Sequence, residues 1–248
     1  CFGINLAKLD IRQESSRHSQ LIGEFVKKKY NKDYLKLSEK EKIDFLKSKL
    51  NSKKNIINKF QFKNKENKEV WSTFNLLSKE PSECLGAYVI SMTSSASDIL
   101  SVSFLQKEAK IKNKLRVVPL FETLDDLINA KSIMENLFSH KWYRNLIKHK
   151  QEVMIGYSDS SKDAGKMCAS WHQYKAQEEI VKLGNKYKID ITFFHGRGGS
   201  AGRGGGPIQA TLRSLPPYSV NGKIRITDQG EVIQQKYGYE PLAKYNLC

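Results

Sequence analysis

The chain has 248 residues, of which 39% are hydrophobic, and this is enough to bury the core of one large α/β domain. Its formal net charge is +16, but only eight of its 42 basic residues are arginine, and the lysines crowd residues 27–68 beside many asparagines. That composition is typical of a solvated surface and weighs against a nucleic-acid-binding module, which would interleave aromatic and basic residues. No apolar run approaches the length of a membrane span, so no membrane-embedded segment is expected.

The chain begins at Cys1 and Phe2, already inside an apolar run, and without an initiator methionine. We therefore expect it to be a fragment of a longer protein. Its cysteines, at positions 1, 84, 168 and 248, show no metal-ligand spacing, which favours free thiols in a reducing compartment.

Residues 4–11 alternate apolar and polar side chains, as a half-buried strand does, and Arg12 follows directly. A long polar and helical region comes next. We expect residues from about 18 to 84 to be a helical, Lys-rich insertion in a single domain that covers residues 1–248.

Within this insertion, Ser38 and Glu41 form a capping box that predicts a helix through Leu50. Residues 66–77 again have helical spacing. Residues 51–68 are expected to be a mobile surface loop.

Five further apolar runs follow, and polar side chains come directly after each of them. The runs span residues 85–92, 115–121, 153–157, 189–194 and 223–227. Ser97 and Thr123 are the expected N-caps of the helices after the first two runs. A long helix is expected after residues 158–163 and ends near Gly184–Asn185, a natural C-cap.

The spacing of these runs predicts the fold class. From residue 85 onward they recur about every 30 to 38 residues, the length of a βα unit. Polar residues follow each run rather than precede it, as in a (β/α)₈ barrel, whereas a doubly wound sheet gathers its ligand contacts at one switch point. We therefore predict an α/β fold, a partial TIM-type barrel of six consecutive strands with added helices.

Residues 193–207, FFHGRGGSAGRGGGP, hold seven of the sixteen glycines within eleven positions. Glycines let consecutive N–H groups form an anion-binding concavity, and Arg197 and Arg203 add planar guanidinium groups that suit phosphate or carboxylate. Pro207 is expected at the first position of a helix whose positive end faces this loop. An Arg-Gly tract that binds RNA is the alternative, disfavoured because an apolar strand leads in and a helix leads out.

Seven residues are expected to meet at the carboxyl ends of the strands: Arg12, Glu122, Asp159, Lys162, His195, Arg197 and Arg203. Glu122 and Asp159 can hold Mg²⁺ or Mn²⁺ and leave the remaining positions to water and substrate oxygens. The plainer alternatives are a helix N-terminal carboxylate for Glu122, a turn residue for Asp159, an exposed cation for Lys162 and a structural group for His195. Together the seven suit a small substrate that bears phosphate and carboxylate.

Seven motifs follow one another along essentially the whole chain: LDIRQESSRH, GAYVISM, LRVVPLFETLDDL, SHKWYRNLI, VMIGYSDSSKDAG, FFHGRGGSAGRGGGP and RITDQGEVIQQKYG. In this order they resemble the phosphoenolpyruvate carboxylase family. The resemblance implies a lyase that forms oxaloacetate and phosphate from phosphoenolpyruvate and bicarbonate with Mg²⁺ or Mn²⁺. It also implies a cytoplasmic homotetramer that dicarboxylates inhibit. The alternative is another metal-dependent barrel enzyme acting on a phosphorylated enol or keto acid, which gives no reason for the GYSDSSKDAG run.

The resemblance assigns roles to the residues that match its motifs. Glu122 and Asp159 match metal ligands, and Arg12 matches a phosphate-binding arginine. Lys162 matches a catalytic group close to the substrate.

Within the glycine loop, Arg197 matches a further catalytic and substrate-binding group, with Gly198 and Gly199 beside it. His195 matches the catalytic histidine near the carboxylation step. Arg203 matches a loop arginine linked both to activity and to inhibition by dicarboxylates.

The chain departs from the family pattern in two ways, and only the second bears on activity. Ala96 stands where the family usually has proline, which is a tolerable change. The family's essential histidine, in a His-Pro-Thr motif, has no counterpart in these 248 residues, so we expect the chain alone to be inactive.

Overall fold

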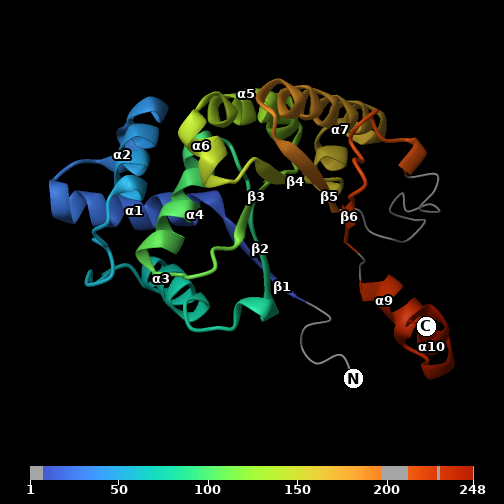
Figure 1. The fold of residues 1–248 in the computed structure, drawn as a ribbon, viewed down its shortest axis with the longest axis horizontal. Coiled ribbons are helices and arrows are strands. Elements are labelled where there is room, and N and C mark those ends of the chain that lie inside the picture. The colour runs from blue at the N-terminus through green and yellow to red at the C-terminus, as the bar shows by residue number, and fades with distance from the viewer. Residues whose placement is uncertain (1–7, 197–211, 228–229, 248) are drawn as a thin grey trace.

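A computed structural model of the chain describes residues 8–196, 212–227 and 230–247 (Figure 1). Six parallel strands pair in chain order: β1 (Leu9–Glu14), β2 (Leu85–Ser91), β3 (Arg116–Phe121), β4 (Lys150–Gly156), β5 (Asp190–Gly196) and β6 (Arg225–Ile226). The sheet curls into a half-barrel, which confirms the predicted partial barrel. The strand order never reverses, so the doubly wound alternative, which needs a switch point, is wrong.

The long connection between β1 and β2 is helical. It holds α1 (Ser15–Tyr30), η2 (Tyr34–Lys36), α2 (Glu39–Asn51), α3 (Lys65–Leu77) and η3 (Ser82–Cys84). The capping box at Ser38 and Glu41 is present, with the Ser38 N–H donating to Glu41 Oε2 at 2.8 Å. The loop expected at 51–68 is shorter and is anchored, because Ile57 is fully buried and its N–H donates to Glu108 Oε2 at 2.7 Å.

Helices also follow β2, β3, β4 and β6: α4 (Ala96–Glu108), α5 (Leu124–Ser139), α6 (Lys141–Leu146), α7 (Ser158–Tyr187), α9 (Gly230–Tyr237) and α10 (Glu240–Leu247). Thr123 caps α5 as predicted, its Oγ1 accepting the Asp126 N–H at 3.1 Å. The N-cap of α4 is Ser95 rather than Ser97. The helix begins earlier because Asp98 Oδ2 accepts the Ser95 N–H at 2.9 Å, which fixes the N-cap two residues before the predicted one.

α7 runs past the predicted C-cap at Gly184–Asn185 and ends at Tyr187, with Lys188 as its C-cap at a φ of 56°. Gly184 serves helix packing instead, since a Cβ there would lie 2.6 Å from Ile191 Cγ1. A glycine therefore lets α7 approach β5 closely. α7 has 30 residues, but neither it nor any other helix in the described ranges is both long and apolar enough to cross a bilayer.

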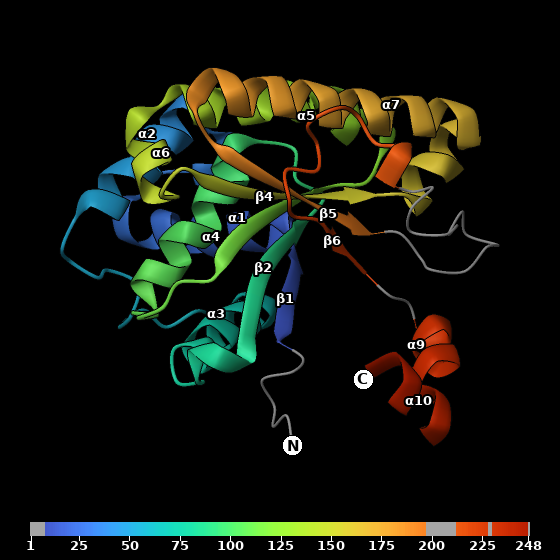
Figure 2. The ribbon, with the colours of Figure 1, turned by 45° about the vertical axis from the view of Figure 1, so that its right-hand side comes forward.

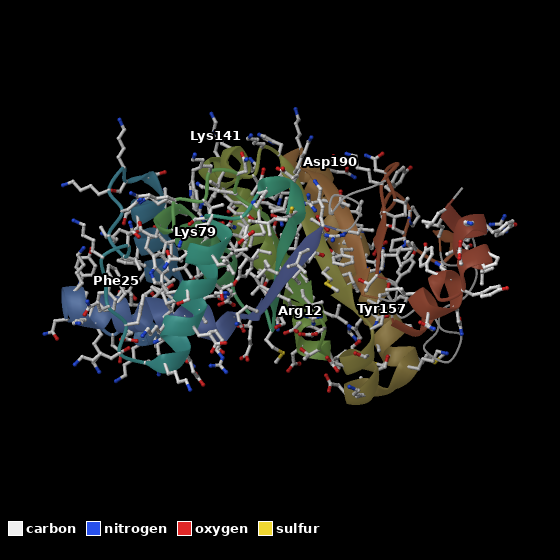
Figure 3. The ribbon with its side chains drawn as sticks, turned by 90° about the horizontal axis from the view of Figure 1, so that it is seen from below. Arg12, Phe25, Lys79, Lys141, Tyr157 and Asp190 are labelled. Carbon is white, nitrogen blue, oxygen red and sulfur yellow. The ribbon has the colours of Figure 1, made fainter. Side chains whose placement is uncertain are left out.

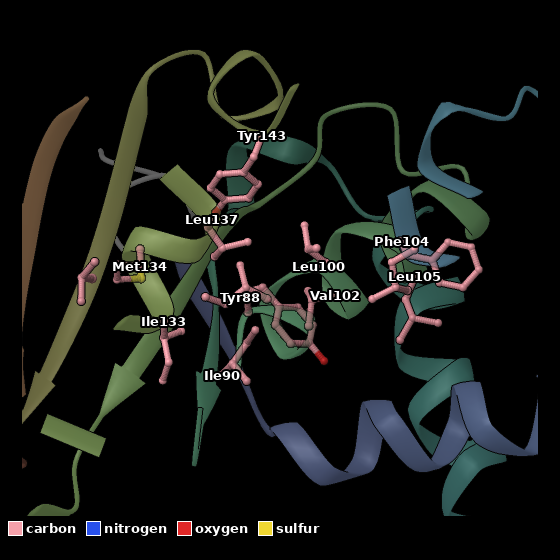
Figure 4. Close-up of a cluster of buried hydrophobic side chains, with 14 of the residues drawn as sticks. Tyr88, Ile90, Leu100, Val102, Phe104, Leu105, Ile133, Met134, Leu137 and Tyr143 are labelled. Carbon is pink, nitrogen blue, oxygen red and sulfur yellow. The ribbon is translucent and has the colours of Figure 1, made fainter. Parts of the chain in front are cut away.

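The two faces of the sheet bury different side chains, because successive residues of a strand point to opposite sides. Helices gather on the outer side of the curl (Figure 2), where Tyr88 and Ile90 of β2 join Leu100 and Leu137 of the helices in the main core (Figure 4). The inner face holds a smaller apolar cluster drawn from strands alone: Ala87, Val89, Val118, Leu120, Met154 and Phe194.

Charged side chains bridge the interior of the half-barrel near the amino ends of the strands. Glu152 of β4 accepts from Arg116 Nε and from Arg225 Nη1, both at 2.8 Å. Arg225 also pairs with Asp10 of β1, and its guanidinium carbon lies 4.2 Å from the centroid of the Phe194 ring. This network links β1 to β6, the two edge strands of the sheet.

Residues 1–248 are expected to self-associate when they are produced alone. β1 and β6 each pair along one side only in the described part of the chain, and such edges pair with other chains. Met167 and Trp171, 90% and 62% exposed, add apolar surface. Light scattering after size-exclusion chromatography should show a mass that rises with protein concentration and with salt, which screens the +16 net charge. A monomer at every salt concentration would contradict this expectation.

Candidate functional site

Arg12, Glu122, Asp159 and Lys162 lie at one rim of the half-barrel, because parallel strands end on the same side. Figure 3 shows Arg12 and Tyr157 along this rim and Asp190, at the start of β5, at the opposite end of the strands. The predicted strand at 4–11 placed Arg12 just after the strand. β1 extends to Glu14, so Arg12 lies within it.

Glu122 lies at the centre of the contacts on this rim, directly after β3. Its Oε2 accepts from Arg12 Nη2 at 3.1 Å, and its Oε1 accepts from the Met92 N–H at 3.4 Å. The Glu122 side chain is only 11% exposed, whereas that of Arg12 is 52% exposed. Arg12 therefore stands between a buried carboxylate and solvent.

The carboxylate of Glu122 does not cap helix α5. Thr123 and Asp126 form the capping box there, and Asp126 Oδ2 accepts from the N–H groups of Glu122 and Thr123 at 3.2 and 3.1 Å. Burial raises the pKa of Glu122, and the charges of Asp159 and Asp126 raise it further, while Arg12 and the Met92 N–H oppose the shift. The carboxylate is thus held in a place where a further positive charge would favour its ionised form.

Asp159 and Lys162 are the second and fifth residues of α7, where a loop was predicted. Their side chains form an ion pair, with Lys162 Nζ 2.9 Å from Asp159 Oδ1, and are 42% and 74% exposed. The helix N-terminus favours a carboxylate at this position. Each of the two candidate metal ligands is therefore paired with a candidate substrate-binding cation.

The main chain ties these two ligand segments together. The Ser160 N–H donates to the Glu122 carbonyl oxygen at 2.8 Å. At the end of β4, a Cβ on Gly156 would lie 2.6 Å from Glu122 Cβ and 2.9 Å from Glu122 Cα. The absence of a side chain at Gly156 lets the ends of β3 and β4 approach this closely.

His195 is buried at the end of β5. Strand alternation places it on the outer face with Phe193, whose ring centroid is 6.3 Å away, while Phe194 belongs to the inner cluster. Its Nδ1 lies 2.8 Å from the Tyr157 hydroxyl oxygen. The structure therefore links His195 to Tyr157.

Four further candidates fall outside the described residues: Arg197, Gly198, Gly199 and Arg203. The predicted helix start at Pro207 also lies outside the described residues.

The rim brings the two candidate metal ligands, Glu122 and Asp159, onto adjoining segments. No cluster of three or more His, Cys, Asp or Glu side chains able to hold a metal occurs in the described ranges. A cavity of about 1020 Å³ lies elsewhere, at the amino ends of the strands between Arg116, Lys150 and Lys223. Chemistry in barrels of this kind takes place at the carboxyl ends, so the rim remains the candidate site.

Two contributors to the rim were not predicted from the sequence. Met92 has a φ of 53°, a conformation that methionine seldom adopts, and its main chain contacts both Glu122 and Ser15. Tyr157, the partner of His195, was assigned only as the end of a strand. The contacts of Met92 are made by its main chain, so no pattern of side chains could predict them. Tyr157 could have been found from its place in the GYSDSS run.

A model of the phosphoenolpyruvate carboxylase family matches residues 1–248. The chain is 49% identical to phosphoenolpyruvate carboxylase of Flaveria pringlei over 97% of its length and 25% of the relative. It is 50% identical to phosphoenolpyruvate carboxylase 3 of Arabidopsis thaliana over 96% of its length and 25% of the relative. It is 49% identical to the enzyme of Shewanella sediminis over its whole length and 28% of the relative. The chain thus spans about a quarter of the length of the curated relatives it matches, and it belongs to the phosphoenolpyruvate carboxylase family.

Proposed function

We propose that the chain is part of an enzyme that carboxylates phosphoenolpyruvate with bicarbonate to give oxaloacetate and phosphate. The observation that carries this proposal is the family match over all 248 residues, at about half identity to carboxylases of plants and bacteria. The rim supports it independently, since Arg12, Glu122, Asp159 and Lys162 meet there in two ion pairs.

Glu122 and Asp159 are the proposed ligands of Mg²⁺ or Mn²⁺. Carboxylate oxygens are the donors that these cations take, and water and substrate oxygens complete such sites. The fit is electrostatic as well, because Asp159 raises the pKa of Glu122 and a shared cation would offset that repulsion. A bound divalent cation supplies stabilisation for negative charge that develops on substrate oxygens.

Arg12 and Lys162 are the proposed cations for the phosphate and carboxylate of the substrate. In the structure Arg12 pairs with Glu122 and Lys162 pairs with Asp159. The side chain of Arg12 is half-exposed and that of Lys162 is exposed. We propose that binding exchanges these partners, so that each carboxylate faces the metal and each cation faces an anionic group of the substrate. Arg197, with the N–H groups of Gly198 and Gly199, would add a planar guanidinium group and an anion-binding loop.

The proposed reaction has two stages. The phosphoryl group first moves from phosphoenolpyruvate to a bicarbonate oxygen, which forms carboxyphosphate and leaves the enolate of pyruvate. Carboxyphosphate then breaks into CO₂ and phosphate, and C3 of the enolate attacks CO₂ to give oxaloacetate. His195, oriented by the Tyr157 hydroxyl, is the proposed residue near the carboxylation step, and the other cations offset the charge of the enolate.

The family resemblance supports further proposals for the full-length protein. These are a cytoplasmic homotetramer, inhibition by dicarboxylates that involves Arg203, and a single barrel domain with a helical, Lys-rich insertion at about residues 18–84. The last is supported by the succession of helices between β1 and β2.

The function is tested on the full-length gene product. We expect phosphate release from phosphoenolpyruvate that requires both bicarbonate and Mg²⁺ or Mn²⁺, with oxaloacetate as product. The Asp159→Asn variant should raise the half-saturating Mg²⁺ concentration at least about tenfold. Loss of a contact that only orients a metal ligand already weakens metal affinity by about that factor. Phosphate release that ignores bicarbonate would favour the alternative barrel enzyme, and an unchanged Mg²⁺ requirement would make Asp159 a turn residue.

The pH dependence of stability tests the burial of Glu122. Its pKa in the folded chain is raised above the ordinary value of 4.5, so its ionisation lowers the stability of the folded state as pH rises through that raised pKa. Without metal, Glu122→Gln should therefore melt at a higher temperature than the unchanged protein at neutral pH. The difference should narrow as the pH falls toward 4.5. A difference that does not vary with pH, measured by thermal melts in chelator, would contradict this account, and Mn²⁺ binding should be lost in the variant.

A further inference from the structure

α7 is divided near its start by Gly165. The φ and ψ of Gly165 are 77° and 160°, which no helix contains, and no atom lies within 4 Å of the position a Cβ would take. The turn at residues 158–164, which carries Asp159 and Lys162, is therefore not held in place by a continuous helix. Its orientation depends on contacts made across the break.

Gln173 makes two such contacts from the long second part of α7. Its Nε2 donates to Ser160 Oγ at 3.0 Å and to the Gly156 carbonyl oxygen at 3.3 Å. Gln173 is 4% exposed and Ser160 is fully buried, so water does not compete freely for either hydrogen bond. One side chain thus connects the second part of the helix both to the turn and to the end of β4.

Ser160 in turn contacts the candidate site through its main chain. It follows Asp159 directly, and its N–H donates to the carbonyl oxygen of Glu122 at 2.8 Å. Asp159 and Glu122 both carry carboxylates on segments that this contact joins, and like charges close together repel each other. A turn that was hinged at Gly165 and otherwise loose would relax away from Glu122.

We propose that Gln173 and Ser160 are positioning residues that hold Asp159 beside Glu122 so that both carboxylates reach one divalent cation. This inference rests on the proposed function, because it assumes that these carboxylates are metal ligands. Neither residue touches the cation or the substrate in this account. Both act by fixing the backbone that carries Asp159, as second-layer hydrogen bonds do around metal ligands in general.

The experiment compares Gln173→Leu with Gln177→Leu in the full-length protein. Gln177 lies one turn further along the same helix and is 2% exposed, and its Nε2 donates to the Gln173 carbonyl oxygen at 2.9 Å. Both changes remove a buried amide of the same size, but only the first removes the hydrogen bonds to Ser160 and Gly156. The readouts are the Kd of Mn²⁺ without substrate, from titration of free Mn²⁺ by electron paramagnetic resonance, and the melting temperature.

Gln173→Leu should weaken Mn²⁺ binding about tenfold, and Gln177→Leu should leave it unchanged at a similar melting temperature. Hydrogen exchange of the peptide around Ser160 should become faster in the first variant only. Ser160→Ala, which keeps the N–H contact to Glu122 but loses the hydroxyl, should weaken Mn²⁺ binding in the same direction. This smaller change decides the question if Gln173→Leu does not fold.

Two results would overturn the proposal. One is unchanged Mn²⁺ binding in folded Gln173→Leu or Ser160→Ala protein, and the other is an equal loss in Gln177→Leu, which would indicate general damage to α7. Asp159→Asn separates this failure from that of the proposed function. If Asp159→Asn binds Mn²⁺ as tightly as the unchanged protein, the metal assignment itself is wrong.

Discussion

Parallel pairing of the strands in chain order is the constraint from which the candidate site follows. A parallel pair needs a crossover that returns the chain to the starting side, so every strand ends on the same rim. Arg12 and Glu122 are 110 positions apart, yet they form an ion pair there, since β1 and β3 both pair with β2. The helices that make the crossovers cover the outer face of the sheet. The carboxyl ends of the strands remain available for polar chemistry.

Features that depend on a few neighbouring residues could be predicted from the sequence. The strand runs, the capping box at Ser38 and the cap at Thr123 are of this kind, because the side chain and the backbone group that it meets lie within one turn. The half-barrel followed from the period of the runs. Glu122 was predicted to lie at the rim because it ends such a run, and it does.

Features set by contacts between distant segments could not be predicted in this way. Gly184 resembles a C-cap in the sequence, but the side chain of Ile191 determines its role. The face on which His195 lies depends on the register of β5, and a shift of one residue would reverse it. Gln173 looks like any polar helix residue until the break at Gly165 brings its amide to the turn that carries Asp159.

The ion pair between Asp10 and Arg225 joins residues 215 positions apart, which has a consequence for the order of folding. Contacts between neighbouring βα units need only short loops to close, whereas this contact must wait until the whole sheet exists. On a ribosome, Asp10 is made long before its partner, and its Oδ1 can meanwhile accept the Ala87 N–H, a contact of 2.8 Å in the folded chain. The two edges of the curl are therefore joined last. A chain released before β6 is made would lack Arg225, the guanidinium that both Asp10 and Glu152 contact inside the half-barrel.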